Sequence, residues 1–185
     1  MMRRGAVLIF WLLGVAGFVL DPGSAGATSI QYQATELSAS QNTWEYTYAV
    51  SGFVFPVNSG FSVHFDPTLY SMLANPPPAV NSDWNVISLQ PDSNLPADGL
   101  YDALALKDSA SLQNPFTVSF VWKGAPGTTP GVQVFDVNQF DTNGNLIQQL
   151  ETGTTTPVPE PDSVTLIGIG LALGAIGQRH RRARS

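Results

Sequence analysis

Hydrophobic and polar residues alternate along most of the chain between Thr28 and Gly153. The segment Trp44-Glu45-Tyr46-Thr47-Tyr48 is typical, with aromatic residues on one face of an extended chain and polar residues on the other. A period of two, rich in aromatic and β-branched residues, predicts half-buried strands, because successive side chains on a strand point to opposite faces. We expect strands at residues 29–38, 43–55, 60–65, 84–89, 100–106, 116–123, 132–140 and 145–150.

Turn-forming residues separate these predicted strands. Asn143-Gly144 lies between the last two, and an Asn-Gly pair is the strongest short-range signal for a β-hairpin. Asp66 followed by Pro67 is the pattern of a helix N-cap and first helical residue, which predicts one short helix over residues 67–73. Many short strands without a sustained helical period predict an all-β domain over residues 28–153, either an antiparallel β-sandwich or a jelly-roll-like fold.

Residues 1–27 have the three parts of a secretory signal peptide. Two arginines near the start precede an apolar run of fifteen residues, 6–20, and Ala25-Gly26-Ala27 has the small-x-small pattern of a signal peptidase site. The alternative is a retained membrane anchor, but fifteen helical residues span only about 22 Å of a membrane core of about 30 Å. We therefore expect cleavage between Ala25-Gly26-Ala27 and Thr28, and export of the protein.

The C-terminal residues form three segments: a Thr/Pro-rich linker at 154–163, an apolar Gly-rich segment at 164–178 and a basic tail at 179–185. Alternating prolines predict that the linker is extended, polyproline-like and outside any sheet or helix. The apolar segment is short for a membrane helix, although arginine side chains at its end can snorkel. The positive-inside rule places the basic tail in the cytoplasm and residues 28–157 on the far side of the membrane. The arginines concerned are Arg179, Arg181, Arg182 and Arg184.

Residues 157–185 resemble the PEP-CTERM sorting signal of Gram-negative bacteria. Pro159, Glu160 and Pro161 match the triplet that gives the family its name, followed by the short apolar segment and the basic end. The resemblance implies cleavage by an exosortase, a membrane-embedded processing enzyme. The protein would then lie at the inner membrane during processing and afterwards at the cell surface or outside the cell, in a bacterium that makes exopolysaccharide. The alternative is an ordinary tail anchor, although such anchors usually have about 20 apolar residues.

Charge and cysteine content exclude several classes of function. The chain has no Cys, which excludes disulfides, thiol nucleophiles and Cys-based zinc sites. Between Thr28 and Pro157 the only Lys or Arg residues are Lys107 and Lys123, against eleven Asp and Glu. So acidic a body cannot neutralise a phosphate backbone, and we expect no nucleic-acid partner.

Candidate catalytic residues are sparse. His64 is the only histidine between Thr28 and Gly153; we expect it to face away from the core, together with Ser62, and no Gly-x-Ser-x-Gly elbow is present. A single His without Cys gives too few ligands for zinc. Carboxylates cluster at Asp92, Asp98, Asp102 and Asp108, where turn formation is the usual role. We therefore expect a non-catalytic domain with no metal and no cofactor.

Two other functions remain as alternatives to a plain cell-surface or extracellular-matrix protein. Ser, Thr, Asn and Gln supply forty-five of the 130 residues from 28 to 157, a surface suited to hydrogen bonding with extracellular polysaccharide. A carbohydrate-binding module could use Trp44, Trp84 or Trp122 as stacking platforms, although tryptophans in a sandwich more often belong to the core. A secreted glycan-active enzyme would need two carboxylates that face each other across a cleft.

Overall fold

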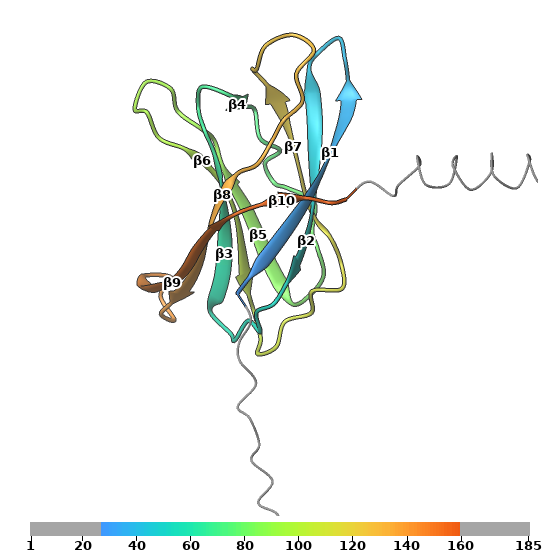
Figure 1. Cartoon of the computed structure of the whole chain (residues 1–185). Helices are drawn as coiled ribbons and strands as arrows, with labels where there is room; N and C mark the ends of the chain where they lie inside the picture. The colour runs from blue at the N-terminus through green and yellow to red at the C-terminus, as the bar shows by residue number, and fades with distance from the viewer. Residues whose placement is uncertain (1–26, 160–185) are drawn as a thin grey trace, which may run out of the picture.

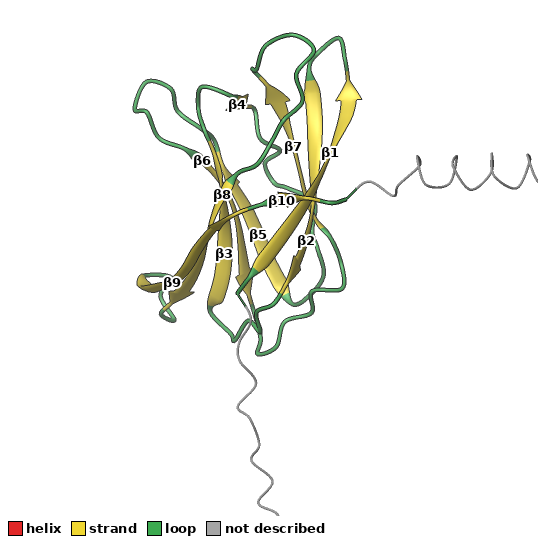
Figure 2. Cartoon of the chain, in the orientation of Figure 1, coloured by secondary structure: helices red, strands yellow, loops and turns green. Residues whose placement is uncertain are grey.

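A computed structural model describes residues 27–159 of the chain (Figure 1). All regular structure in this part is β, as Figure 2 shows. None of the described residues belongs to a helix of the length and apolar character that a membrane crossing requires. The strands are β1 (Ser29–Ser38), β2 (Thr43–Ser51), β3 (Ser59–Phe65), β4 (Tyr70–Ser71), β5 (Trp84–Leu89), β6 (Gly99–Ala105), β7 (Phe116–Trp122), β8 (Val134–Phe140), β9 (Leu146–Thr154) and β10 (Thr156–Pro157).

The strands form two sheets, each with five strands. The first sheet has the order β10-β1-β2-β7-β4, and the second has the order β5-β6-β3-β8-β9. Every pairing is antiparallel except that of β1 with β10, which is parallel. The two sheets lie face to face (Figure 1), so the prediction of an all-β sandwich is confirmed.

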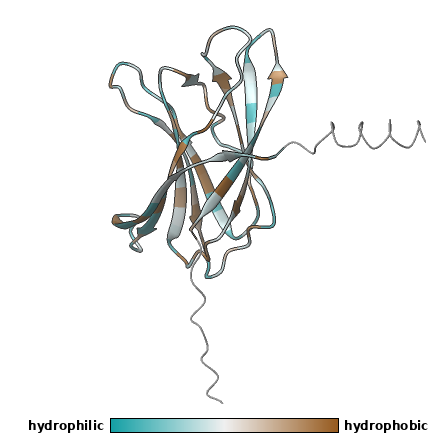
Figure 3. Cartoon of the chain, viewed as in Figure 1, coloured by the Kyte–Doolittle hydropathy of each residue, from teal (hydrophilic) through white to brown (hydrophobic). Residues whose placement is uncertain are grey.

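Aromatic side chains fill the space between the sheets. The strands β6 and β7 alternate strictly between buried and half-buried residues, and Figure 3 shows the matching alternation of hydropathy along the strands. Phe61 of the second sheet meets Phe116 of the first edge to face, with ring centroids 4.9 Å apart. Burial of such large rings is the main stabilising contribution in a chain that has no disulfide. The aromatic residues with less than 2% exposure are Tyr46, Tyr48, Phe55, Phe61, Phe65, Tyr101, Phe116, Phe120 and Phe135.

Two strand boundaries differ clearly from the prediction, and the other six predicted strands agree within two residues at each end. The strand expected over 43–55 ends at Ser51, because Gly52 follows with a φ of +86°. A Cβ on Gly52 would lie 2.4 Å from the carbonyl oxygen of Ala27, so the backbone approaches too closely for any other residue. The strand expected over 145–150 continues to Thr154, because it pairs with β8 along that whole length.

The short helix predicted over residues 67–73 is wrong. Asp66 does cap a turn, since its Oδ1 accepts hydrogen bonds from the Thr68 amide and hydroxyl, each 2.7 Å long. The turn ends at once, and Tyr70 pairs with Trp122 of β7 as the start of β4. Tyr70 is 4% exposed and packs against core rings, and this tertiary burial outweighs the local preference for a helix.

The proline-rich linker joins the first sheet, contrary to the expectation that it stays outside any sheet. Thr156 and Pro157 form β10 beside β1, and the Val158 amide donates a 2.9 Å hydrogen bond to the Tyr32 carbonyl. Proline is tolerated here because β10 is an edge strand, where only one side of the chain needs hydrogen bonds. Strand pairing therefore continues up to the residue that precedes Pro159.

Candidate functional site

A row of polar side chains crosses the outer face of the second sheet. Strand register places the polar residues Asp136, Ser62 and Asp102 side by side on β8, β3 and β6, with the apolar Ile87 next to Asp102 on β5. Ser62 and His64 occupy the face of β3 opposite the core residues, as the alternation predicts, although Ser62 is only 8% exposed. The sheet thus gathers residues that are far apart in the sequence into one surface.

His64 is held between two carboxylates on this face. Its Nε2 lies 2.9 Å from Asp136 Oδ2, and its Nδ1 lies 3.3 Å from Asp98 Oδ2. Asp136 Oδ1 in turn accepts a 2.8 Å hydrogen bond from the side-chain amide Nε2 of Gln149. Because both ring nitrogens are engaged, His64 has no free nitrogen to accept a proton from a serine hydroxyl in this arrangement. The network orients polar side chains and gives no base for nucleophilic catalysis.

Asp102 is the least satisfied polar group of the row. Its Oδ1 atom is buried and has no hydrogen-bond partner among the described residues. Burial raises the pKa of the Asp102 carboxyl above its usual value, and the neighbouring Ser62 hydroxyl and His64 ring lower it only in part. The protonated carboxyl is therefore favoured more than in a solvated aspartate.

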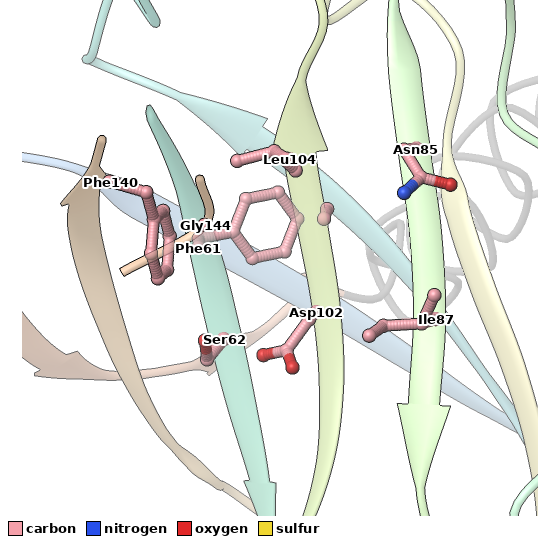
Figure 4. A pocket seen from close by; sticks show the side chains of 9 residues that line it. Phe61, Ser62, Asn85, Ile87, Asp102, Leu104, Phe140 and Gly144 are labelled. Atoms are coloured by element: carbon pink, nitrogen blue, oxygen red, sulfur yellow. The ribbon is translucent and has the colours of Figure 1, made fainter. Parts of the chain in front are cut away.

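A small hollow of about 250 Å³ opens on the outer face beside this carboxyl. Figure 4 shows Ser62 and Asp102 at one end, Phe140 and Leu104 towards the other, and Asn85 and Ile87 along β5. Most of the lining is apolar, with one carboxyl, one amide and one hydroxyl as polar side-chain groups, which is the usual character of a ligand pocket. Its volume lies just below the ~300–1,000 Å³ typical of such pockets. A small polar ligand with an apolar face would fit here.

The carboxylates that cluster in the sequence do not meet in a cleft. Asp92 accepts the Asn94 amide within its own loop, Asp108 accepts the Val57 amide, and Asp98 pairs with His64. Among the residues that line the hollow, Asp102 alone is a carboxylate. The described residues therefore offer no pair of carboxylates across this hollow of the kind that glycoside hydrolysis requires. Turn formation and hydrogen bonding account for the other three.

The three candidate tryptophans belong to the core and offer no stacking platform. Trp44, Trp84 and Trp122 are 8%, 5% and 7% exposed. Each indole N–H already has an acceptor: the Asn42 side chain for Trp44, the Ser111 carbonyl for Trp84 and the Thr128 hydroxyl for Trp122. At these exposures none of the three presents an open ring face on which a sugar could stack.

No group of three or more His, Asp or Glu side chains within residues 27–159 is arranged to hold a metal ion. The two carboxylates around His64, those of Asp98 and Asp136, are engaged by His64 and by the Gln149 side chain.

The two processing sites predicted from the sequence lie at the limits of the described chain. Ala27 is exposed, whereas Thr28 is buried and its backbone nitrogen lies 3.0 Å from both carboxylate oxygens of Glu151. Pro159, the first residue of the sorting triplet, is exposed and directly follows the last hydrogen bond to the first sheet. The other predicted site residues, Ala25, Glu160, Pro161, Arg179, Arg181, Arg182 and Arg184, lie outside the described residues.

Comparisons with known proteins give little beyond this geometry. No protein-family model matches the chain, and no curated protein matches its sequence. Among solved structures, the chain is similar to the cohesin module from Clostridium perfringens ATCC13124 family 33 glycoside hydrolase, with 13% identity and a TM-score of 0.36. The match covers 71% of this chain and 97% of that module. A similarity this low has no bearing on function.

Proposed function

We propose that the chain is an exported, non-catalytic β-sandwich protein of the cell surface or extracellular matrix, sorted by a PEP-CTERM-type signal that an exosortase cleaves. The observation that carries the proposal is the ordered pattern of residues 157–185: a Pro-Glu-Pro triplet, a short apolar segment and terminal arginines. A signal peptide pattern at the opposite end requires the same membrane topology.

The geometry of the linker supports this proposal. Hydrogen bonding to the sheet ends with Val158, and Pro159 is exposed at the edge of the first sheet. The triplet therefore begins immediately where the sandwich ends. A single carboxylate, Glu160, between two conformationally restricted prolines is a compact recognition element, because proline fixes φ and reduces the entropy lost on binding. The processing enzyme would meet the motif next to the folded domain.

The test follows the tail in the native host with two epitopes. One is inserted in the loop at exposed Leu95, which lies between β5 and β6, and the other is appended after Ser185. In wild-type cells we expect the C-terminal epitope to be lost from the species that carries the loop epitope. Glu160→Ala should block this loss, whereas the matched control Asp162→Ala, a carboxylate outside the triplet, should leave it unchanged. An ordinary tail anchor predicts one membrane-bound band with both epitopes in every strain.

Carbohydrate binding is the second candidate function, and the hollow beside Asp102 is the observation that favours it. Its polar groups, Asp102 and Asn85, can hydrogen-bond sugar hydroxyls, while Ile87 and Leu104 supply apolar surface. The eleven carboxylates against two lysines between residues 28 and 157 disfavour anionic polysaccharides, so we expect a neutral glycan.

Affinity electrophoresis tests this second candidate with a soluble neutral β-glucan and with alginate, which is anionic. We expect retardation in the glucan gel only. Asn85→Ala should weaken that retardation about tenfold, consistent with loss of a polar contact in a ligand site, and Asn94→Ala in the distant loop should not. Absence of retardation in both gels would leave the non-catalytic surface role without sugar binding.

A further inference from the structure

Thr28 is held at the junction of the two sheets by a single carboxylate. Its backbone nitrogen lies 3.0 Å from Glu151 Oε1 and 3.0 Å from Oε2, and its hydroxyl donates a 2.6 Å hydrogen bond to Oε2. Thr28 is only 7% exposed although it directly precedes β1 of the first sheet. Glu151 belongs to β9 of the second sheet, so this contact joins the two sheets.

The Glu151 carboxylate can accept more hydrogen bonds than the single N–H of a backbone amide at this position can donate. A backbone amide has one N–H to share between two oxygens, and it carries no charge to balance the carboxylate. Within residues 27–159, no Lys, Arg or His forms an ion pair with Glu151. An α-ammonium group in the same place would carry three N–H donors and a positive charge, which matches both oxygens at once.

We propose that Glu151 is the binding site for the α-ammonium group that signal cleavage creates on Thr28. The inference rests on the proposed export and cleavage after Ala27, and it assigns a role to the new chain end. Cleavage replaces the neutral amide donor by a cationic one, so that a Coulomb attraction between two opposite charges is added to the hydrogen bonds with the Glu151 carboxylate. Maturation therefore strengthens the link between the first and second sheets.

The burial of this segment also sets the order of events. Ser29 pairs with Ser51 as soon as β1 is in place, and Ile30 is 1% exposed. A peptidase binds several residues on each side of the bond in an extended, accessible conformation, which the docked strand cannot supply. Cleavage must precede docking of β1, and the free amino group then binds Glu151 as the sandwich closes.

A double-mutant cycle tests the pair with full-length mature chains. Each chain ends at Ser185 and is kept in detergent. It is released from an N-terminal fusion by a protease that leaves no extra residue. They begin at either Thr28 or Ala27, which shifts the α-amino group by one residue, about 3.8 Å between Cα atoms. Each start is combined with Glu151 or Glu151→Gln, and Glu36→Gln on the exposed part of β1 is the control.

We expect Glu151→Gln to increase the unfolding equilibrium constant roughly tenfold more in chains that begin at Thr28 than in chains that begin at Ala27. Glu36→Gln should have the same small effect with both starts. Equal effects of Glu151→Gln in the two backgrounds would overturn the proposal. If Glu151→Gln unfolds the Thr28 chain outright but leaves the Ala27 chain folded, the pair is stronger than expected and the proposal stands.

A second measurement reports on the amino group itself. At neutral pH, acylation by an amine-reactive ester should label the Thr28 amino group at least about tenfold more slowly than that of the Ala27 start, and Glu151→Gln should remove most of the protection. Labelling at equal rates in the two starts contradicts the pair. The N-terminus of the protein exported with its own signal peptide is determined separately, and an uncut chain there would refute the proposed export while leaving the measured pairing intact.

Discussion

Asp102 is a residue whose burial destabilises the folded state when its carboxyl is ionised. Its carboxyl lies on the outer face of the second sheet, with a buried oxygen that lacks a partner among the described residues. The alternation of residues 100–106 already places Asp102 opposite Tyr101 and Ala103, which face the core. The sequence does not reveal its burial, because that depends on Ser62 and Ile87 from neighbouring strands whose order no local pattern specifies.

The raised pKa of Asp102 gives a prediction with a defined sign. The folded state holds the Asp102 proton more tightly than the unfolded state, so its contribution to stability falls as pH rises above the usual aspartate pKa, about 3.9, through the raised folded value. Asp102→Asn removes the ionisation. We expect Asp102→Asn to stabilise the protein at pH 7, and we expect this gain in the free energy of unfolding to vanish below about pH 3.5. Urea unfolding at a series of pH values across that range measures the effect.

Asp141 provides the control of opposite sign. Hydrogen bonds from Asn145 and Asn143 lower the pKa of the Asp141 carboxyl, so this group stabilises the fold above the usual aspartate pKa and loses that effect as pH falls. Asp141→Asn should therefore destabilise the protein at pH 7 and converge with the wild type in acid. A parallel pH dependence of stability for wild type and Asp102→Asn would refute the role given to Asp102 burial.

At the level of elements, local signals predicted the long strands well and the short ones not at all. The hairpin at Asn143-Gly144 is confirmed: Gly144 has a φ of +84°, and its amide bonds to the Asp141 carbonyl. By contrast, β4 and β10 contain two residues each and exist only because β7 and β1 present edges to them. A pattern of period two cannot appear in two residues, so no sequence signal could have located these strands.

Gly144 permits a prediction about this hairpin that separates conformational strain from packing. A Cβ at Gly144 would meet nothing within 4 Å, so the only cost of Gly144→Ala is the positive φ. We expect a loss of about 1–2 kcal/mol in the free energy of unfolding. Gly131→Ala is the matched control, because its Cβ also meets nothing but its φ is not positive, and it should be neutral or slightly stabilising. Similar losses for both variants in urea unfolding would contradict this account.

The whole molecule depends on a few polar links that cross between its sheets. Gln133 is 5% exposed and directly precedes β8 of the second sheet. It makes one such link by accepting a hydrogen bond from the Tyr48 hydroxyl of the first sheet, and it donates its side-chain amide to the His64 carbonyl within the second sheet. Its backbone exchanges two further hydrogen bonds with Thr155, where the chain passes from β9 to β10. Gln133 lies within the strand predicted over 132–140, where a polar residue between two valines indicates a solvent-facing position, so the sequence gives no sign of its burial.

The link through Gln133 gives a prediction for the entire sandwich. Gln133→Leu keeps most of the buried volume but leaves the Tyr48 hydroxyl and the His64 carbonyl without this partner, and we expect a loss of about 2–4 kcal/mol in the free energy of unfolding. Adding Tyr48→Phe removes the hydroxyl that Gln133→Leu leaves without a partner, so the double variant should recover about 1 kcal/mol relative to Gln133→Leu alone. Tyr48→Phe by itself should be destabilising. Urea unfolding followed by tryptophan fluorescence measures all four proteins, since Trp84 and Trp122 lie in the same core. Additive losses would mean that the Tyr48–Gln133 hydrogen bond does not couple the sheets; a partial rescue would identify it as a specific connection between them.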